Sequence, residues 1–245
     1  MSIQFSFGNE EEFLLLANNQ PFVMPLPQLL ATPGCPAGQW SHEAHQGMLE
    51  HATPICYSLQ SLYQHILQSR RFLADLASSM QVQLYCGGTH PQLDWPALQM
   101  TATYQAVVDE YQDTVKALTL FGMHTHIGIN DNALLVQVFN ALRPYLAPLL
   151  ALSANSPFYR GRDTGLSSYR AMQFLLMPRT GTPPISVRRS ACRRSCRRTP
   201  LSMFSVFWSK PTSNRGFQVF SPRFWCPIWT SCVMSSTPSP RSAAR

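Results

Sequence analysis

All acidic residues of this 245-residue chain fall before its last quarter, which limits how much of it can form one ordinary folded domain. Residues 1–186 contain 8 Lys and Arg and all 12 Asp and Glu, whereas residues 187–245 contain 11 Lys and Arg and no acid. The net charge of +7 therefore averages over an acidic piece and a strongly basic piece. We expect a folded N-terminal part over residues 1–186 and a separate basic segment over residues 187–245.

Composition narrows the class of protein further. A hydrophobic fraction of 45% can supply a sizeable core. We find no run of about 18 uncharged apolar residues, so no transmembrane helix is expected. The N-terminal residues show no basic stretch followed by an apolar stretch, as a signal peptide would, and an acidic residue already occurs at Glu10. This pattern predicts a cytoplasmic protein. Seven irregularly spaced cysteines do not suggest a disulfide framework.

The hydrophobic pattern predicts strands mixed with helices. Strands are expected at residues 3–16, 48–52, 82–86 and 118–129, and helices at residues 54–80, 101–117, 131–143, 146–154 and 168–176. Residues 17–41 and 155–168 are rich in Pro, Asn, Gly and Ser and are predicted to be loops. Because the strands and helices do not alternate regularly, we predict an α+β fold with an antiparallel or mixed sheet.

The stretch FGNEEEF places three carboxylates inside the first predicted strand. The two-residue period of a strand puts Glu10 and Glu12 on one face and Glu11 on the other. Two carboxylates on a buried face repel each other unless a cation lies between them, and Mg²⁺ or Mn²⁺ prefers such oxygen ligands. The alternative is an exposed edge strand with solvated acids.

The stretch MHTHIGI likewise places two polar side chains, here imidazoles, on one face of a predicted strand. His124 and His126 share one face of a predicted strand and lie between Gly122 and Gly128. Imidazole can ligate a metal or bind a phosphate or carboxylate. The alternative is a pair of histidines satisfied within the core.

Other polar residues are less specific. Glu50 is a single acid in MLEHATP, for which a solvent-facing position is the simplest interpretation. Residues 88–91, GTHP, form a tight turn at a strand end. Arg160, Arg162 and Arg170 lie in a polar loop where their guanidinium groups could bind phosphate or carboxylate, or simply face solvent. No GxxxxGK[ST] loop is present, so ATP binding of the P-loop kind is excluded.

Six stretches, taken in order, resemble the glutamate–cysteine ligase type 2 family, the carboxylate–amine ligases. They are FGNEEEFLL, LEHATPIC, GGTHP, FGMHTHIGI, LLALSANSPFYRGRDTGLSSYR and MPRTGTPP, which together span about residues 5–184. The resemblance implies a fold similar to the catalytic domain of glutamine synthetase. In that fold a curved, mainly antiparallel sheet holds ATP and metal on its concave face and carries helices on its outer face.

The resemblance also implies a reaction and a set of site residues. The expected reaction is ATP-dependent ligation of glutamate to cysteine, or to a related amine, through an acyl phosphate. Glu10, Glu12 and Glu50 would hold Mg²⁺ or Mn²⁺ at the phosphates of ATP. The other candidates are His124, His126, Thr89 and His90 for the cofactor, and Arg160, Arg162 and Arg170 as catalytic residues. No membrane or nucleic-acid partner is expected of such an enzyme, and a homodimer is compatible with the resemblance.

The resemblance ends at the charge boundary, and two explanations compete. A strand close to TLEVRVCDTP would be expected after PRTGTPP in the family, but residues 187–245 contain no counterpart. An out-of-frame translation after codon 186 explains the sudden loss of both motif and acids, and predicts a disordered tail and weak or absent ligase activity. The alternative is a non-enzymatic protein whose basic, aromatic tail binds nucleic acid. The spacing of Cys192, Cys196, Cys226 and Cys232 does not suggest a zinc site.

Overall fold

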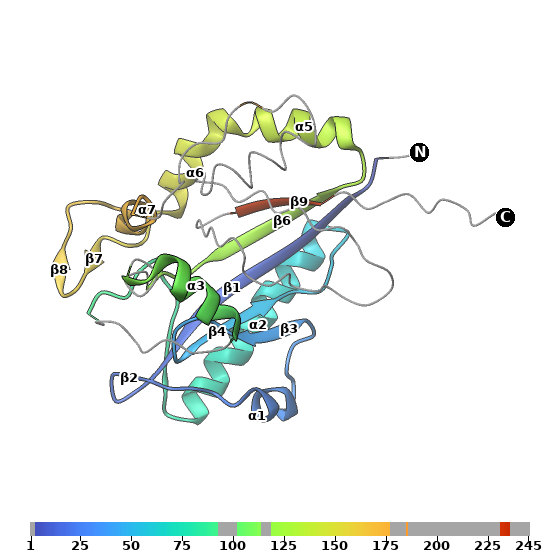
Figure 1. Cartoon of the computed structure of the whole chain (residues 1–245). Coiled ribbons are helices and arrows are strands. Elements are labelled where there is room, and N and C mark those ends of the chain that lie inside the picture. The colour runs from blue at the N-terminus through green and yellow to red at the C-terminus, as the bar shows by residue number, and fades with distance from the viewer. Residues whose placement is uncertain (1–2, 93–101, 114–118, 177–184, 186–230, 236–245) are drawn as a thin grey trace.

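The computed structural model describes residues 3–92, 102–113, 119–176, 185 and 231–235 (Figure 1). In this part of the chain seven strands form one open sheet, with helices packed against it. The α+β class with a mainly antiparallel sheet is therefore confirmed. Apart from Ser231–Ser235, the basic segment predicted for residues 187–245 lies outside the described residues.

The sheet is organised around its first and longest strand, β1 (Phe5–Ala17). Its antiparallel partners are β2 (Gln20–Pro21), β4 (Met48–Ala52), β5 (Gln83–Tyr85) and β6 (Met123–Ile129). Asn18 and Asn19 turn the chain from β1 into β2 with φ values of 51° and 60°, the left-handed conformation that a two-residue hairpin requires. The predicted strand at residues 3–16 is thus confirmed, with small shifts at its ends.

Two further strands extend the sheet to either side. β3 (Gln39–His42) pairs with β4 in antiparallel fashion, and β9 (Ser231–Ser235) pairs with β6 in parallel. The order along the sheet is β3-β4-β1-β6-β9. A separate hairpin joins β7 (Phe158–Tyr159) to β8 (Arg162–Asp163) and lies at the side of the sheet in Figure 1.

Helices are α1 (Leu26–Ala31), α2 (Leu59–Ser79), α3 (Ala102–Tyr111), α5 (Asn132–Ala141), α6 (Leu146–Ser153) and α7 (Tyr169–Phe174), with a 3-10 turn η1 (Arg143–Tyr145). The structure corrects two expectations. Residues 17–41 hold β2, α1 and most of β3 rather than a plain loop. Helix α2 begins after Ser58, whose side chain accepts a hydrogen bond from the N–H of Ser61, and not at Thr53-Pro54.

The main core lies on one face of the sheet, beneath α2. Phe13 and Leu15 point from β1 towards Leu73 and Ala77 of α2, and all four side chains are at least 96% buried. Leu49 of β4 joins the same cluster. A smaller cluster packs α5 against the end of β6. These apolar residues have the parity of Glu11, whereas the opposite face carries Glu10 and Glu12 at one part of β1 and a smaller apolar cluster, Leu14, Leu16, Met48 and Phe121, at another.

One helical stretch of the described residues, 132–153, is long and apolar enough by length and composition to cross a membrane. It runs from α5 through η1 into α6 and is interrupted by Pro144 and Pro148. Arg143 lies in its middle, where a charge is costly in lipid. These three residues make the stretch a weak candidate for a membrane span.

Candidate functional site

The alternation of β1 separates its three carboxylates as the sequence predicts. In the sheet register Glu10 lies opposite Ala52 and His124, and Glu12 lies opposite Glu50. These residues share one face of the sheet. Glu11 points to the other face, where α2 packs.

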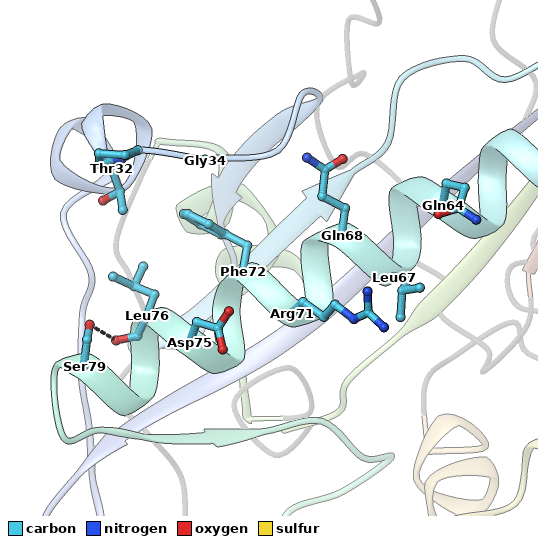
Figure 2. Close-up of a pocket in the computed structure, with 11 residues that line it drawn as sticks. Thr32, Gly34, Gln64, Leu67, Gln68, Arg71, Phe72, Asp75, Leu76 and Ser79 are labelled. Atoms are coloured by element: carbon cyan, nitrogen blue, oxygen red, sulfur yellow. Dashed lines mark hydrogen bonds between the residues drawn. The ribbon is translucent and has the colours of Figure 1, made fainter.

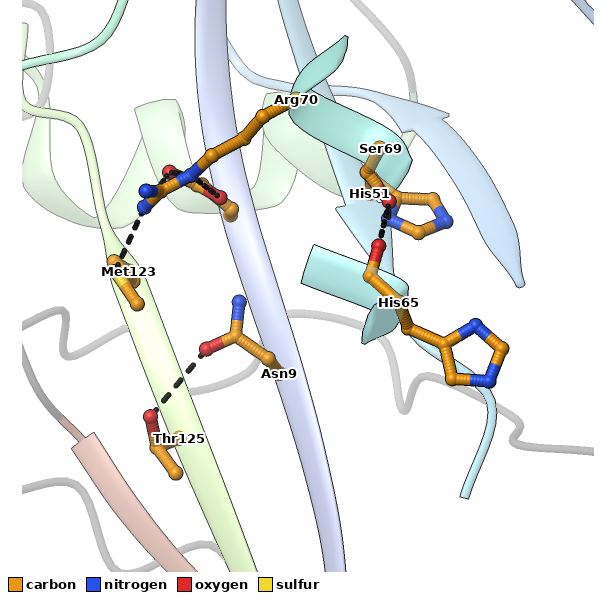
Figure 3. Close-up of polar contacts among 8 residues, drawn as sticks. Asn9, His51, His65, Ser69, Arg70, Met123 and Thr125 are labelled. Atoms are coloured by element: carbon orange, nitrogen blue, oxygen red, sulfur yellow. Dashed lines mark hydrogen bonds and ion pairs between the residues drawn. The ribbon is translucent and has the colours of Figure 1, made fainter. Parts of the chain in front are cut away.

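Arg70 of α2, labelled in Figure 3, binds the carboxylate of Glu11. The Nε and Nη2 atoms of Arg70 donate hydrogen bonds of 3.0 and 2.7 Å to Glu11 Oε1, and Nε also lies 3.0 Å from Oε2. Beside this pair Thr125 donates a hydrogen bond of 3.3 Å to Asn9, which ties β6 to β1. Glu11 therefore joins strand to helix and takes no part in the opposite face.

The other face gathers three buried carboxylates. Glu12, Glu43 and Glu50 each offer an oxygen, and these oxygens lie within 4.8 Å of one another. Glu50 accepts a hydrogen bond of 3.4 Å from Ser41 and is hydrogen-bonded to Glu43. Glu50 is only 7% exposed, so the expectation that it faces solvent is wrong. Three carboxylates so placed form a set of ligands suited to a hard divalent cation.

Glu10 takes a different set of neighbours. Its Oε2 atom lies 3.4 Å from Nδ1 of His124 and 3.2 Å from Nε2 of His126. Both imidazoles project from β6 onto the carboxylate face. The structure thus brings together Glu10, Glu12, Glu50, His124 and His126, all of which the sequence singled out.

Burial and like charges strain the carboxylates of this face. Burial raises the pKa of Glu50 well above its usual value, and the charges of Glu10 and Glu12 raise it further. Burial also raises the pKa of Glu12, partly offset by the charge of His124 and by the Gly122 N–H. For Glu10 burial acts in the same direction, but hydrogen bonds from His124 and His126 outweigh it and hold its pKa well below the usual range.

Glycine at position 122 leaves space between two polar atoms that have no hydrogen-bond partner. The N–H of Gly122 donates a hydrogen bond of 2.8 Å to Glu12 Oε2. A Cβ at this position would lie 2.5 Å from His124 Nε2 and 3.2 Å from Glu12 Oε1. Both atoms are buried and unpartnered. An imidazole nitrogen and a carboxylate oxygen left open to one space fit a divalent cation well.

Comparison with known proteins supplies the decisive observation. The family model described as Glutamate-cysteine ligase family 2 (GCS2) matches residues 6–203, well over half of the chain. This chain belongs to glutamate–cysteine ligase family 2.

Individual relatives of this family agree. A Roseiflexus protein named "Putative glutamate--cysteine ligase 2" is 38% identical over 144 residues, which is 58% of this chain and 38% of that protein. Chloroflexus aurantiacus and Sorangium cellulosum have proteins of the same name, 36% and 34% identical, each aligned over 74% of this chain. The alignments cover 47% and 50% of these two proteins. The chain thus spans half or less of the length of these relatives.

The three arginines predicted as catalytic residues lie in two different environments. Arg160 and Arg162 lie on the β7–β8 hairpin, and both side chains are exposed. Arg160 and Gly161 form the turn with φ values of 50° and 74°. Arg170, in contrast, is 99% buried at the start of α7 and donates a hydrogen bond of 2.8 Å to the carbonyl of Phe121. Only Arg170 approaches the buried carboxylate face.

Thr89 and His90, predicted to bind the cofactor, lie in a turn packed against other loops. The hydroxyl of Thr89 donates a hydrogen bond of 3.0 Å to the carbonyl of Phe158. The ring of His90 lies 4.7 Å from that of Tyr85, and burial lowers the pKa of His90. Their assignment to ATP binding stays a prediction.

Two residues of the site escaped prediction. Glu43 directly follows β3, a strand of four residues that is too short to show a clear period. Since Ser41 faces Glu50, the two-residue alternation of a strand would place Glu43 on the same face. Gly122 was noted only as a flank of the histidines, yet its N–H binds Glu12. Both depend on pairing between distant segments.

A pocket of about 650 Å³ lies elsewhere, on the helix side of the sheet (Figure 2). It is lined by α2 residues that include Gln64, Gln68, Arg71 and Asp75, and by the turn at Thr32 to Gly34. The face of α2 opposite these residues covers the main core. The pocket is therefore separate from the carboxylate face.

Proposed function

We propose that this chain carries the metal-binding and nucleotide-binding face of an ATP-dependent carboxylate–amine ligase, with glutamate and cysteine, or a related amine, as substrates. The observation that carries the proposal is the buried set Glu12, Glu43 and Glu50 beside Glu10 and His124. Membership of glutamate–cysteine ligase family 2 supports the reaction class. ATP use, the acyl phosphate and the identity of the amine are part of the proposal.

The chain's own residues would bind and orient the phosphates. Glu12, Glu43 and Glu50 would hold Mg²⁺ or Mn²⁺, and His124 offers a nitrogen to the same space. The bound cation supplies positive charge that neutralises the transferring phosphoryl group. Glu10 keeps His124 and His126 oriented through its contacts with both rings.

The proposed reaction has two steps. An oxygen of the glutamate γ-carboxylate attacks the γ-phosphorus of ATP, the bond to the β-phosphate oxygen breaks, and ADP leaves. The cysteine amine then attacks the carbonyl carbon of the acyl phosphate, loses a proton and expels phosphate, which leaves an amide. Because burial in the sheet excludes water from Glu12 and Glu50, their interactions with the bound cation would be strengthened.

Titration calorimetry with Mn²⁺, and then with Mg²⁺ and ATP together, tests the proposal. We expect Glu12→Gln to weaken Mn²⁺ binding at least tenfold, because one ligand loses its charge. Glu11→Gln is the matched control, since Glu11 neighbours Glu12 but faces α2. Equal Mn²⁺ affinity in the two variants, both folded by circular dichroism, would remove the metal site and with it the proposed function.

Turnover by the 245-residue chain is a separate question. We predict weak or no synthesis of γ-glutamylcysteine. If residues 187–245 are translated out of frame, the chain lacks the part of the family's sequence that normally follows residue 186. Measurable turnover by the purified chain would contradict this prediction. Sequencing the DNA across codons 180–192 in all three frames tests the hypothesis itself, since a one-base shift should restore a strand like TLEVRV.

A further inference from the structure

The peptide group between Phe121 and Gly122 lies between a buried cation and a buried anion. Its carbonyl oxygen accepts a hydrogen bond of 2.8 Å from Arg170 Nε. Its N–H donates a hydrogen bond of 2.8 Å to Glu12 Oε2. Arg170 is 99% buried and Glu12 is 98% buried. One peptide dipole therefore has the guanidinium at its negative end and the carboxylate at its positive end.

Such an arrangement is cooperative. A cation at the carbonyl polarises the peptide group and strengthens the hydrogen bond that its N–H makes. The same contact fixes the plane of the peptide, and with it the direction of the Gly122 N–H. The charge of Arg170 also favours the ionised form of Glu12. Arg170 thus acts on Glu12 through a backbone group.

Neighbouring loops hold the residues on either side of this contact, Phe121 and Arg170. The N–H of Phe121 donates a hydrogen bond of 3.2 Å to Gly88, and the N–H of Gly88 donates one of 2.8 Å to the side chain of Asn155. The N–H of Arg170 donates to Ser156 Oγ at 3.2 Å. The two loops at residues 87–91 and 155–170 therefore converge on the start of β6.

We propose that Arg170 is a positioning residue for Glu12. Arg170 fixes the Phe121–Gly122 peptide, and the Gly122 N–H of that peptide binds Glu12 Oε2. Glu12 Oε1 is then left directed at the space beside His124 Nε2, where the metal would bind. The inference rests on the metal site of the proposed function. It assigns Arg170 to the support of a metal ligand, in place of contact with phosphate or substrate.

The backbone amide of Gly122 reports this link directly in nuclear magnetic resonance of the full chain. A hydrogen bond to a carboxylate moves an amide proton to high frequency, so we expect a large shift to lower frequency in Glu12→Gln. Arg170→Gln should move the same resonance in the same direction. The double variant should then add little to Glu12→Gln alone, because both changes act on one hydrogen bond. Arg71→Gln, an exposed arginine on α2, is the matched control.

Mn²⁺ titration supplies the second measurement. We expect Arg170→Gln to weaken Mn²⁺ binding by about tenfold or more, as loss of a group that orients a ligand usually does. Arg170→Lys keeps the charge but not the geometry of the guanidinium group. Its Mn²⁺ affinity should lie between those of Arg170→Gln and the unmodified chain. If Arg170→Gln fails to fold, the amide shift of Arg170→Lys decides the question. Partial recovery of Arg170→Ala by added guanidinium, at concentrations far below those that unfold the chain, would support the proposal independently.

The outcomes separate the two proposals. An unchanged Gly122 amide in a folded Arg170 variant overturns the positioning role, whatever the variant does to Mn²⁺ binding. Weaker Mn²⁺ binding with an unchanged amide would mean that Arg170 affects the metal site by a route other than the Gly122 N–H, which also overturns the positioning role. If the unmodified chain binds no Mn²⁺ at all, the proposed function fails, while the amide measurement still tests the link from Arg170 to Glu12.

Discussion

At the scale of single residues, the carboxylate face holds an arrangement of buried like charges that lowers the stability of the fold. Glu12 and Glu50 lie opposite each other on neighbouring strands, both buried and both acidic. Like charges in this position destabilise a folded chain unless a cation or a proton lies between them. Glu50 is also hydrogen-bonded to Glu43, and a hydrogen bond between two carboxyl groups requires that one of them carries a proton.

This conflict leads to a prediction for Glu50→Gln. The variant should be more stable than the unmodified chain by about 1 kcal/mol without metal, because glutamine keeps the shape and removes a buried charge. The folded pKa of Glu50 is raised above its ordinary 4.5, so the folded state of the unmodified chain loses stability as pH rises above that value. The advantage of the variant should therefore grow over the same range.

Urea unfolding at pH 5 and pH 8, with and without Mn²⁺, measures this effect. Added Mn²⁺ should stabilise the unmodified chain more than the variant. Lower stability of Glu50→Gln at both pH values would show that Glu50 is a structural residue and not a strained ligand.

At the scale of elements, a buried histidine joins β4 to α2 (Figure 3). Nδ1 of His51 lies 2.8 Å from Ser69 Oγ, and Nε2 lies 3.2 Å from the carbonyl of Ala37. Burial lowers the pKa of His51 to about 4. The ring is thus neutral at pH 7 with Nε2–H donating to Ala37, and the single proton of the Ser69 hydroxyl has two acceptors within reach, His51 Nδ1 and the carbonyl of His65.

This contact predicts a loss of stability in mild acid. Between pH 6.5 and about pH 4 the unfolded chain binds a proton at His51 that the folded chain does not, so stability falls as pH falls through this range. The contribution is roughly 3 kcal/mol, fully present above pH 6.5 and gone below pH 4. Urea unfolding of His51→Gln beside the unmodified chain checks it. The pH profile of the variant should be flatter, and parallel profiles would exclude His51 as the cause.

The elements also show how far the sequence alone could lead. The alternation in β1 correctly separated Glu10 and Glu12 from Glu11, because a buried strand forces a two-residue period. Short elements such as α1 and β3 were missed, since four to six residues carry too little period and are stabilised by distant partners. The local context of Glu50 predicted a solvent-facing acid, because a single acid gives no sign of the other acids that the fold brings to it, and only the family resemblance placed it with Glu10 and Glu12.

At the scale of the whole molecule, the basic segment takes part in the sheet at one described point. β9 pairs in parallel with β6 over residues 231–235, on the side of β6 away from β1. The family match also continues to residue 203, beyond the charge boundary at residue 186. The out-of-frame origin of residues 187–245 nevertheless stays a prediction.

Hydrogen exchange tests the contribution of this strand. Removing residues 187–245 should speed exchange of the β6 amides that face β9, while those that face β1 stay protected. Removing only residues 236–245 is the control, because β9 then remains. Identical exchange in the full and shortened chains would show that β9 adds nothing to the sheet in solution.

The central position of β1 has a consequence for synthesis of the chain. β1 leaves the ribosome before its partners β4, β5 and β6, which are complete only at residues 52, 85 and 129. Until β4 follows, the two residues of β2 are the only native strand beside β1 that the described residues supply, which makes this apolar strand prone to pair with other nascent chains. Three adjacent negative charges oppose such pairing by repulsion between identical strands. Glu10, Glu11 and Glu12, which take three different roles in the finished protein, would thus act together to protect the growing chain from aggregation.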